Sequence, residues 1–408
     1  MKLNIVLGAV FFLCALVTKA QDSELPYKEL SIFSGNTHAH TIFTYSHGSH
    51  LKRTRDYIKG DRMLYIDSFF LSRPNKFELK EDWDSFQGLP EKHFEEAKKA
   101  GYDFYFITDH SQEETFHPDA HNNTAWAIAL KQAEEATTDN FTALMGVEHS
   151  ENDSYHTRVH LNVIGPSSYV NALLPGVDLP YFYQWIKDSP INEKTGNPVV
   201  VQLNHPVKNQ FNDFVYLDDE VLDIITVLEI INGLDIHYEA FIEALDNGWK
   251  VSPTAGLDNH NYTAISSWPA RSFVLAEKNT ASHILHAMRN RRTYASFDKN
   301  LDCRYTANDS LMGSTISKAS NYDLSIHIND PDIEDDSDKI IKIEVVTGSG
   351  KIIRSITPSD EVHHINMNIT LNDDEIDHYF FIQLYDNSPV EDSGAHAMTW
   401  LAPVWIKD

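Results

Sequence analysis

Strand and helix patterns alternate along the chain between about residues 90 and 290, and this alternation limits the fold more than any other feature of the sequence. Short apolar runs predict strands over 102–108, 141–147, 160–164, 198–203, 227–231, 251–256 and 272–276. Amphipathic segments predict helices over 91–100, 124–137, 180–188, 238–247 and 280–291. Alternation of this kind is typical of βαβ units that build a parallel α/β sheet. We therefore expect an α/β domain over residues 21–292.

The pattern changes after about residue 293, where short strand-like runs follow one another without a convincing helix. Consecutive strands separated by turns are typical of an antiparallel β-sandwich. We expect such a smaller domain over residues 293–408, with a structural role against the first domain. Trp400 and Trp405 in it have two interpretations. They are core residues of the sandwich or part of a carbohydrate-binding surface.

With 408 residues and a mass of 46.5 kDa, the chain is longer than most domains with a single core. Its 33 Lys and Arg against 60 Asp and Glu give a formal net charge of -27. A balance this acidic argues against DNA, RNA or an anionic membrane surface as the main partner. We expect instead a small anionic substrate, bound in a locally positive pocket. The sequence does not determine the oligomeric state.

The first twenty residues have the pattern of a secretory signal peptide, with Lys2 followed by an apolar run over 3–17 and then by small residues. The run is shorter than the ~20 apolar residues of a membrane-spanning helix. We therefore expect export to a periplasm or out of the cell, with no membrane span once residues 1–20 are removed. Cleavage also removes Cys14 and leaves Cys303 alone, so no intrachain disulfide is expected.

Histidine and acidic residues fall at the ends of the predicted strands. The chain has 21 His, and His is the commonest metal ligand in proteins. Side chains two apart on an extended chain point to the same side, so His38 and His40 can reach one ion. The other residues of this kind are His110, Glu148, His160, His205, Asp258 and His260. Because the carboxyl ends of barrel strands meet at one face, we expect most of these side chains to converge there.

In this order the residues resemble the polymerase and histidinol phosphatase (PHP) superfamily of metal-dependent phosphoesterases. The pattern of that family is a His-x-His, a Thr-Asp-His, a Glu, two separate histidines and an Asp-x-His. The matching stretches are His38-Ala-His40, Ile107-Thr-Asp109-His110, Gly146-Val-Glu148-His149, the single His160 and His205, and Asp258-Asn-His260. The resemblance covers roughly residues 31–275. It implies a distorted, TIM-like (β/α)7 barrel that holds up to three divalent ions.

The resemblance also divides the matching residues into ligand sets. It assigns His38, His40, Glu148 and Asp258 to the first ion, His110 and His260 to the second, and His160 and His205 to the third, with Glu148 as a bridge. Many members of the family have a further ligand five or six residues after the His-x-His motif. Here His47 follows His40 by seven residues and is the candidate, with His50 as its rival. His-rich sites accept Zn, Mn or Fe, so the identity of the metal stays open.

Asp109 and Arg271 are the candidate catalytic residues. Asp109 precedes His110 on a strand and should point to the opposite side, so we expect it to support the ligands from behind, with direct ligation as the alternative. Arg271 stands near the start of a late strand, and a guanidinium group can hold a phosphate or a sugar carboxylate through two hydrogen bonds. We therefore expect Arg271 to contact the substrate.

Together these features predict an exported, metal-dependent phosphoesterase that hydrolyses a small phosphorylated compound, such as a sugar phosphate or a phosphodiester. A bound divalent ion lowers the pKa of its water to about 7, and so provides hydroxide at neutral pH. The sequence has no Gly-x-Ser-x-Gly motif and no phosphate-binding loop that would indicate another hydrolytic mechanism. Two alternatives stay open. One is a metal-dependent hydrolase of a carbon ester or amide, with carbohydrate-related substrates included. The other is a non-catalytic, metal-containing binding protein.

Overall fold

A computed structural model of the protein describes most of the chain. The described residues are 29–44, 51–54, 76–79, 87–111, 125–151, 159–172, 174, 176–208, 210, 211, 214, 217–334, 339–358, 362–387 and 398–407. Among these residues, no helix is both long and apolar enough to cross a membrane. The predicted signal peptide over residues 1–20 lies outside the described residues.

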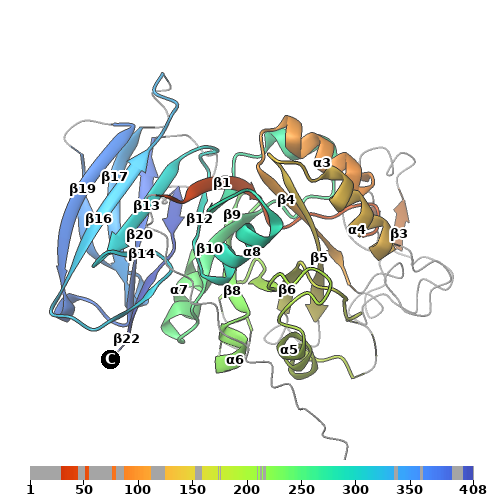
Figure 1. Cartoon of the computed structure of the whole chain (residues 1–408), viewed down its shortest axis with the longest axis horizontal. Helices are drawn as coiled ribbons and strands as arrows, with labels where there is room; N and C mark the ends of the chain where they lie inside the picture. Colours follow the sequence, from red (N-terminus) through yellow and green to blue (C-terminus); the bar gives the residue numbers. More distant parts are fainter. Residues whose placement is uncertain are drawn as a thin grey trace, which may run out of the picture.

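The first part of the chain alternates strands and helices, as the sequence predicts (Figure 1). Its strands are β1 (Ser31–Asn36), β4 (Phe104–His110), β5 (Thr142–Glu151), β6 (Val159–Ile164), β7 (Val200–Leu203), β8 (Ile225–Asn232), β9 (Asp235–Ile236), β10 (Ser252–Gly256), β11 (Arg271–Ala276) and β12 (Thr293–Ser296). Its helices are α3 (Pro90–Lys99), α4 (Ala125–Ala136), α5 (Leu179–Asp188), α6 (Asp219–Leu222), α7 (Tyr238–Asp246) and α8 (Ala281–Arg289), with a 3-10 helix, η4 (Tyr262–Ser267). A separate two-stranded sheet consists of β2 (Leu51–Thr54) and β3 (Lys76–Leu79).

Local sequence explains where the helices begin, and α5 is an example. The side chain of Asp178 accepts a hydrogen bond from Tyr181 N at 2.9 Å, which satisfies one of the backbone donors at the start of α5. Pro180 occupies the first turn, where its missing N–H removes no hydrogen bond. The residues of α5 that are buried are Leu179, Phe182, Tyr183 and Ile186. Burial of this face holds the helix against the sheet.

The strands of the first part form a mixed sheet, so the expectation of a parallel sheet is wrong for some of them. β1, β4 and β5 run parallel, and so do β7, β8 and β10. β6 lies antiparallel between β5 and β7, and β11 lies antiparallel to β1. Only residues 152–158 separate β5 from β6, which is fewer than the dozen or so that a parallel crossover needs.

β10, the first strand of this row, approaches β1, which lies near the other end of the row. The order of the strands is β10-β8-β7-β6-β5-β4-β1-β11-β12. Beyond the ends of β10 and β1, Asp258 N donates to His38 O and His40 N donates to Asn259 O, both at 3.0 Å. A parallel bridge between Ala39 and Asn259 completes this contact. Segments that are far apart in the sequence therefore lie side by side where β1 and β10 end.

The C-terminal part has no α-helix among its described residues and consists of two facing sheets. One contains β14 (Ser310–Leu311), β13 (Asp302–Ala307), β16 (Asn321–Asn329) and β19 (His364–Asn372), and the other contains β15 (Thr315–Ser317), β17 (Ile340–Thr347), β18 (Lys351–Ile356), β20 (Tyr379–Asp386), β21 (Thr399–Leu401) and β22 (Val404–Lys407). Exposed and buried residues alternate along β16, as expected for a strand with one face on a core. Tyr305, Leu324, Ile343 and Phe380 form part of this core. Cys303 is buried and free.

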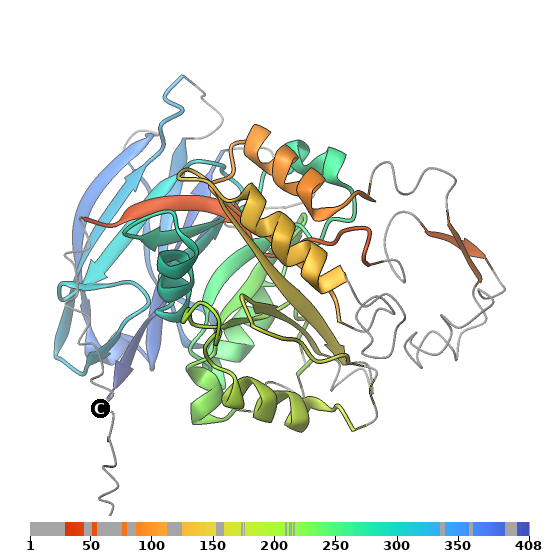
Figure 2. The ribbon, with the colours of Figure 1, turned by 45° about the vertical axis from the view of Figure 1, so that its right-hand side comes forward.

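The two parts share one sheet and one hydrophobic core. β21 pairs antiparallel with β12, so the sheet of 16 strands continues from the first part into the second. Figure 2 shows the C-terminal strands gathered at one end of the molecule, away from α3 and α4. Trp400 and Trp405 are 1% and 5% exposed and belong to the same core cluster as Phe182 and Trp249 of the first part. The interpretation of these tryptophans as a carbohydrate-binding surface is therefore wrong, because other side chains cover both rings.

We expect Trp400→Ala to destabilise both parts together, because this ring fills the core that they share. Truncation of a buried tryptophan lowers the free energy of unfolding by about 3–5 kcal/mol. Denaturation followed by far-UV circular dichroism should show one transition, moved to lower denaturant. In a control, Ile352→Ala should change the free energy of unfolding by less than about 0.5 kcal/mol, since Ile352 is 50% exposed. Two separate transitions in Trp400→Ala would contradict the shared core.

Candidate metal centre

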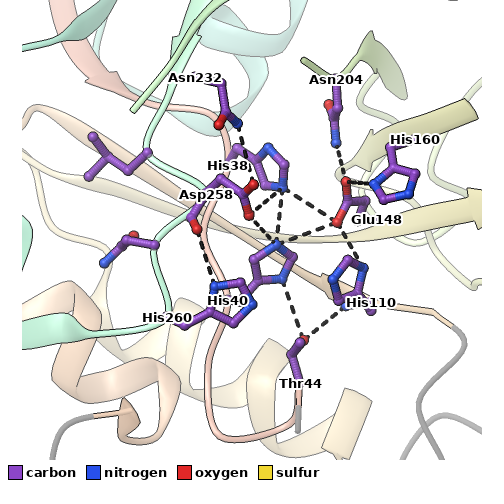
Figure 3. A network of polar contacts seen from close by, with 12 residues as sticks. His38, His40, Thr44, His110, Glu148, His160, Asn204, Asn232, Asp258 and His260 are labelled. Carbon is purple, nitrogen blue, oxygen red and sulfur yellow. Dashed lines mark hydrogen bonds and ion pairs between the residues drawn. The ribbon is translucent and has the colours of Figure 1, made fainter. Parts of the chain in front are cut away.

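His38 and His40 lie in the segment that follows β1, and a buried amide fixes this segment. Asn36 donates from Nδ2 to His38 O at 3.0 Å, and its Oδ1 accepts from Leu257 N at 2.9 Å. One side chain thus joins the segment of the two histidines to the segment that carries Asp258. Figure 3 shows that His38, His40 and Asp258 point toward one another.

Four side chains surround one small space with the spacing of a metal-ion shell. His38 Nε2 and His40 Nε2 are 3.1 Å apart. Asp258 Oδ1 lies 2.9 Å from His40 Nε2 and 3.6 Å from His38 Nε2. Glu148 Oε2 lies 3.4 Å from His40 Nε2 and 3.5 Å from His38 Nε2. Ligands held 2.0–2.1 Å from a tetrahedral ion are roughly 3.3 Å apart, so this set fits a single divalent ion.

Glu148 on β5 is fully buried, and its carboxylate also contacts histidines other than His38 and His40. Its Oε2 also lies 2.8 Å from His110 Nδ1. Its Oε1 lies 3.0 Å from His160 Nδ1 and 3.4 Å from His205 Nε2, and accepts from Asn204 Nδ2 at 2.9 Å. The two oxygens of one carboxylate thus face different histidines. His160 reaches Glu148 because β6 runs antiparallel, which puts the start of β6 opposite the end of β5.

Further groups of potential ligands adjoin this space. His40, His110 and His260 form one, and Glu148, His160 and His205 form another, each with ligand atoms within 4.8 Å of one another. His160 Nε2 and His260 Nε2 are buried without a hydrogen-bond partner among the described residues. A buried ring nitrogen without a partner costs free energy, and coordination of an ion removes that cost. Imidazole and carboxylate donors suit Zn, Mn or Fe, so the residues present fit divalent ions.

The structure brings together every predicted ligand that it describes. These are His38, His40, His110, Glu148, His160, His205, Asp258 and His260. His47 and its rival His50 lie outside the described residues, so their part in the second ion site stays a prediction.

Burial and mutual contact set the charges of the cluster. Burial, followed by the charge of His110, lowers the pKa of His40 to about 3. Burial lowers the pKa of His160 as well, to about 4. Burial alone would raise the pKa of Glu148, but His110, His38 and His160 outweigh it and hold this pKa well below its usual range. Burial alone would lower the pKa of His38, but carboxylates, Glu229 first among them, raise it well above its ordinary value. Since imidazoles bind metals in their neutral form, an ion at this ring would displace a proton.

Asp109 lies behind the ligands, where it holds the segment after His40. Its carboxylate accepts from Thr41 N at 2.6 Å, from Thr41 Oγ1 at 2.7 Å and from Thr44 Oγ1 at 2.8 Å. Thr44 Oγ1 lies 3.4 Å from His40 Nδ1 and accepts from His110 N at 3.0 Å. Burial raises the pKa of Asp109 above its ordinary value, while these hydrogen bonds oppose the rise. Asp109 therefore positions two ligands through Thr44, and the threonines occupy both of its oxygens.

The structure does not bring Arg271 to the cluster. The side chain is only 2% exposed, and Nη1 donates to Trp268 O at 2.8 Å and to Ala270 O at 2.9 Å. The guanidinium carbon lies 3.6 Å from the centre of the Tyr102 ring. The expected contact with substrate is corrected accordingly. Arg271 is the first residue of β11, and the sequence pattern did not show to which face of the sheet its side chain points.

Glu229 on β8 is a buried carboxylate that the sequence analysis missed. Its Oε1 lies 3.0 Å from His38 Nδ1, and its Oε2 accepts from His205 N at 2.8 Å. Because the carboxylate accepts a hydrogen bond, the proton of the neutral His38 ring lies on Nδ1, and Nε2 faces the cluster. Carboxylates orient metal-binding imidazoles in the same way in other proteins. The sequence signal that could have identified Glu229 is the position of a glutamate inside the apolar run 227–231. Gly256 makes room for it, since a Cβ there would lie 1.8 Å from Glu229 Oε1.

Two of the ligands have a strained backbone. His205 has a φ of 28° and Asp258 has a φ of 48°, in the left-handed region that residues other than glycine rarely adopt. Such a conformation costs on the order of 1 kcal/mol and persists only where the surroundings impose it. For His205, the hydrogen bond from its backbone N–H to Glu229 is one such constraint.

Glu229→Gln should weaken the binding of divalent ions by about 10–100-fold, because an amide supports the His38 imidazole less well than a carboxylate does. Titration of the metal-free protein with Zn²⁺ against a competing chromophoric chelator measures this change. Glu344→Gln is the matched control, since Glu344 is also a buried strand glutamate, 4% exposed, but contacts Gln383 and Tyr385 in the C-terminal part. Equal zinc affinity of Glu229→Gln and the parent would contradict a supporting role.

Comparisons with known proteins give distant similarities. No family model and no curated protein matches the chain. It is similar to a two-domain protein from Bacteroides vulgatus that contains a predicted PHP-like metal-dependent phosphoesterase, at 16% identity and a TM-score of 0.45, over 92% of this chain and 96% of that one. It is also similar to PsfC from Pseudomonas syringae, at 14% identity and a TM-score of 0.35, over 65% and 91% of the two chains. A protein from Bifidobacterium adolescentis, assigned as a metal-dependent phosphoesterase, matches at 14% identity and a TM-score of 0.26, over 43% and 84%. At these values the chemistry has to be argued from the residues of the cluster.

Proposed function

We propose that this protein is a metal-dependent phosphoesterase that works with two to three divalent ions. The observation that carries the proposal is the position of the buried Glu148 carboxylate between separate sets of imidazoles. Its Oε2 faces His38, His40 and His110, and its Oε1 faces His160 and His205. A carboxylate with candidate ligands on both sides can bind two adjacent ions, and many enzymes that hydrolyse phosphoesters use paired ions.

The described residues divide among the ions as follows. His38, His40, Asp258 and Glu148 would hold the first, His110 and His260 the second, and His160 and His205 the third. When bound, such ions supply Lewis acidity and activate water for attack. The protein itself fixes the ligands: Glu229 orients His38, and Asp109 positions His40 and His110 through Thr44.

Charge favours an anionic substrate at this centre. Imidazoles bind metals in their neutral form, so the carboxylates that contact the candidate ligands, Glu148, Asp258 and Glu229, oppose the charge of two or three divalent ions. The loaded centre therefore carries a net positive charge in a buried environment, where electrostatic attraction is strong. A phosphoryl group suits such a centre, although the whole chain has a formal charge of -27.

The space beside the centre supports a small substrate. A cavity of about 300 Å³ has His160, His205 and Asp258 in its lining. We propose a small phosphorylated compound, such as a sugar phosphate or a phosphodiester, as the substrate. We also propose that the curled sheet is a distorted barrel of the PHP type, which the hydrogen bonds between the ends of β1 and β10 support.

Elemental analysis of the protein purified without added metal should give two to three ions of Zn, Mn or Fe per chain. Removal of the ions with a chelator should abolish phosphoester hydrolysis, and the double variant His38→Ala/His40→Ala should lose activity and ions while it stays folded. His283→Ala is the control, because His283 pairs with Glu277 on the exposed side of α8 and should leave both unchanged. Hydrolysis that continues after the ions are removed would refute the proposal.

A panel of substrates separates the proposed function from its alternative. The same preparation would be assayed with phosphomonoesters, phosphodiesters and acyl esters. Chelator-sensitive hydrolysis of acyl esters alone would identify a hydrolase that acts on carbon. Bound ions without turnover of any ester would identify a non-catalytic protein.

We further propose that the protein is exported, on the pattern of residues 1–20. N-terminal sequencing of the protein recovered from cells that express the whole chain should begin at Gln21, after cleavage behind Ala20. Protein in the extracytoplasmic fraction is expected together with this terminus. Recovery of an uncleaved chain in the cytoplasm alone would contradict export.

A further inference from the structure

One wall of the cavity is built from residues that the metal centre does not use as ligands. β8 and β9 form a short hairpin in which Asn232 pairs with Asp235. Gly233, at the turn between them, has a φ of 60°, a conformation that glycine adopts readily. Asn232, Asp235 and the following His237 line the cavity beside the ligands. The turn thus places three polar side chains next to the position of a bound phosphoryl group.

The His237 ring lines the cavity, but its Nε2 is buried and is not exposed to a ligand. The ring makes a hydrogen bond with the carbonyl group of Pro206, and its Nε2 has no hydrogen-bond partner among the residues that the structure describes. Since a carbonyl oxygen only accepts, the ring proton lies on the nitrogen that faces Pro206. The neutral ring therefore has a lone pair at Nε2.

Asn232 and Asp235 contribute acceptors. The amide nitrogen of Asn232 donates to Glu229 Oε2 at 3.2 Å and to Asp258 Oδ2 at 3.4 Å, so its oxygen is the atom left for a ligand. Asp235 is exposed and contributes a carboxylate, which only accepts when ionised.

Gln210, which also lines the cavity, contributes a donor. Its Oε1 accepts a hydrogen bond from Val207 N at 3.1 Å, so the amide nitrogen is the atom that it can offer. The wall as a whole presents two acceptor groups, on Asn232 and Asp235, and one donor, on Gln210.

We propose that this wall is a subsite for the hydroxyl groups of the substrate, which would be the phosphate ester of a polyol or a sugar. The proposal rests on the phosphoesterase function proposed above. A hydroxyl group donates one hydrogen bond and accepts others, so it can bind Asp235 or Asn232 and also Gln210. A carboxylate or a second phosphate has no proton for these acceptors and is repelled by Asp235. An apolar chain would leave the polar atoms unpaired, and an ammonium group cannot accept from Gln210.

The test compares esters that share a three-carbon chain and differ in their substituents. Glycerol 1-phosphate, n-propyl phosphate, 3-aminopropyl phosphate and 3-phosphoglycerate would be assayed with the metal-loaded, full-length mature protein. We expect kcat/KM for glycerol 1-phosphate to exceed that for n-propyl phosphate at least about tenfold, roughly the effect of one hydrogen bond that only the first ester makes. 3-Phosphoglycerate should be the poorest substrate of the four.

Variants show whether the wall causes this discrimination. In Asp235→Asn the ratio of kcat/KM for glycerol 1-phosphate to that for n-propyl phosphate should fall about tenfold, chiefly through KM. Glu239→Gln removes an equal charge from an exposed residue of the adjacent α7, outside the cavity lining, and should leave the ratio unchanged.

The outcomes separate this inference from the proposed function. Turnover of all four esters with equal kcat/KM, or an unchanged ratio in Asp235→Asn, would overturn the subsite while the phosphoesterase function stands. A preference for 3-aminopropyl phosphate over glycerol 1-phosphate would overturn the assignment to hydroxyl groups. No turnover of any phosphoester by the metal-loaded protein would overturn the proposed function, and the subsite with it.

Discussion

Two main-chain hydrogen bonds hold the site together, because they join the segment after β1 to the segment after β10. Asp258 N donates to His38 O, and His40 N donates to Asn259 O. These contacts put His38, His40 and Asp258 around one space. His260 follows Asp258 in the same segment, and the remaining candidate ligands lie on or just after β4, β5, β6 and β7, which lie between β1 and β10 in the sheet.

The C-terminal part contributes to the site through α7. His237 is the residue at which α7 begins, and Asp246 at its other end accepts hydrogen bonds from Tyr379 Oη at 2.9 Å and from Ser349 N at 3.0 Å. Because Tyr379 and Ser349 belong to the C-terminal part, that part fixes a helix whose first turn borders the cavity. The structural role expected for the smaller domain thus extends to the wall of the pocket.

The sequence predicted the elements, and the strand ends at which the candidate ligands lie, where local pattern decides them, and it failed where side-chain direction or strand pairing decides. Apolar periodicity located the helices, and strand ends located His110, Glu148 and His205. The direction of β6 depends on the length of the connection before it. The alternation of strands and helices does not take this length into account. The Arg271 side chain points away from the site, and the Glu229 side chain points toward it. Both residues lie on strands whose two faces the apolar pattern did not distinguish, so the sequence predicted neither direction.

The left-handed backbone of His205 and Asp258 has a consequence for how this protein can change. Glycine would relax the main chain at either position, but it would remove a donor atom from the centre. In the metal-free chain, heat resistance and ion binding therefore make opposite demands on these two residues. Bound ions remove this conflict, because a ligand of the folded state stabilises that state.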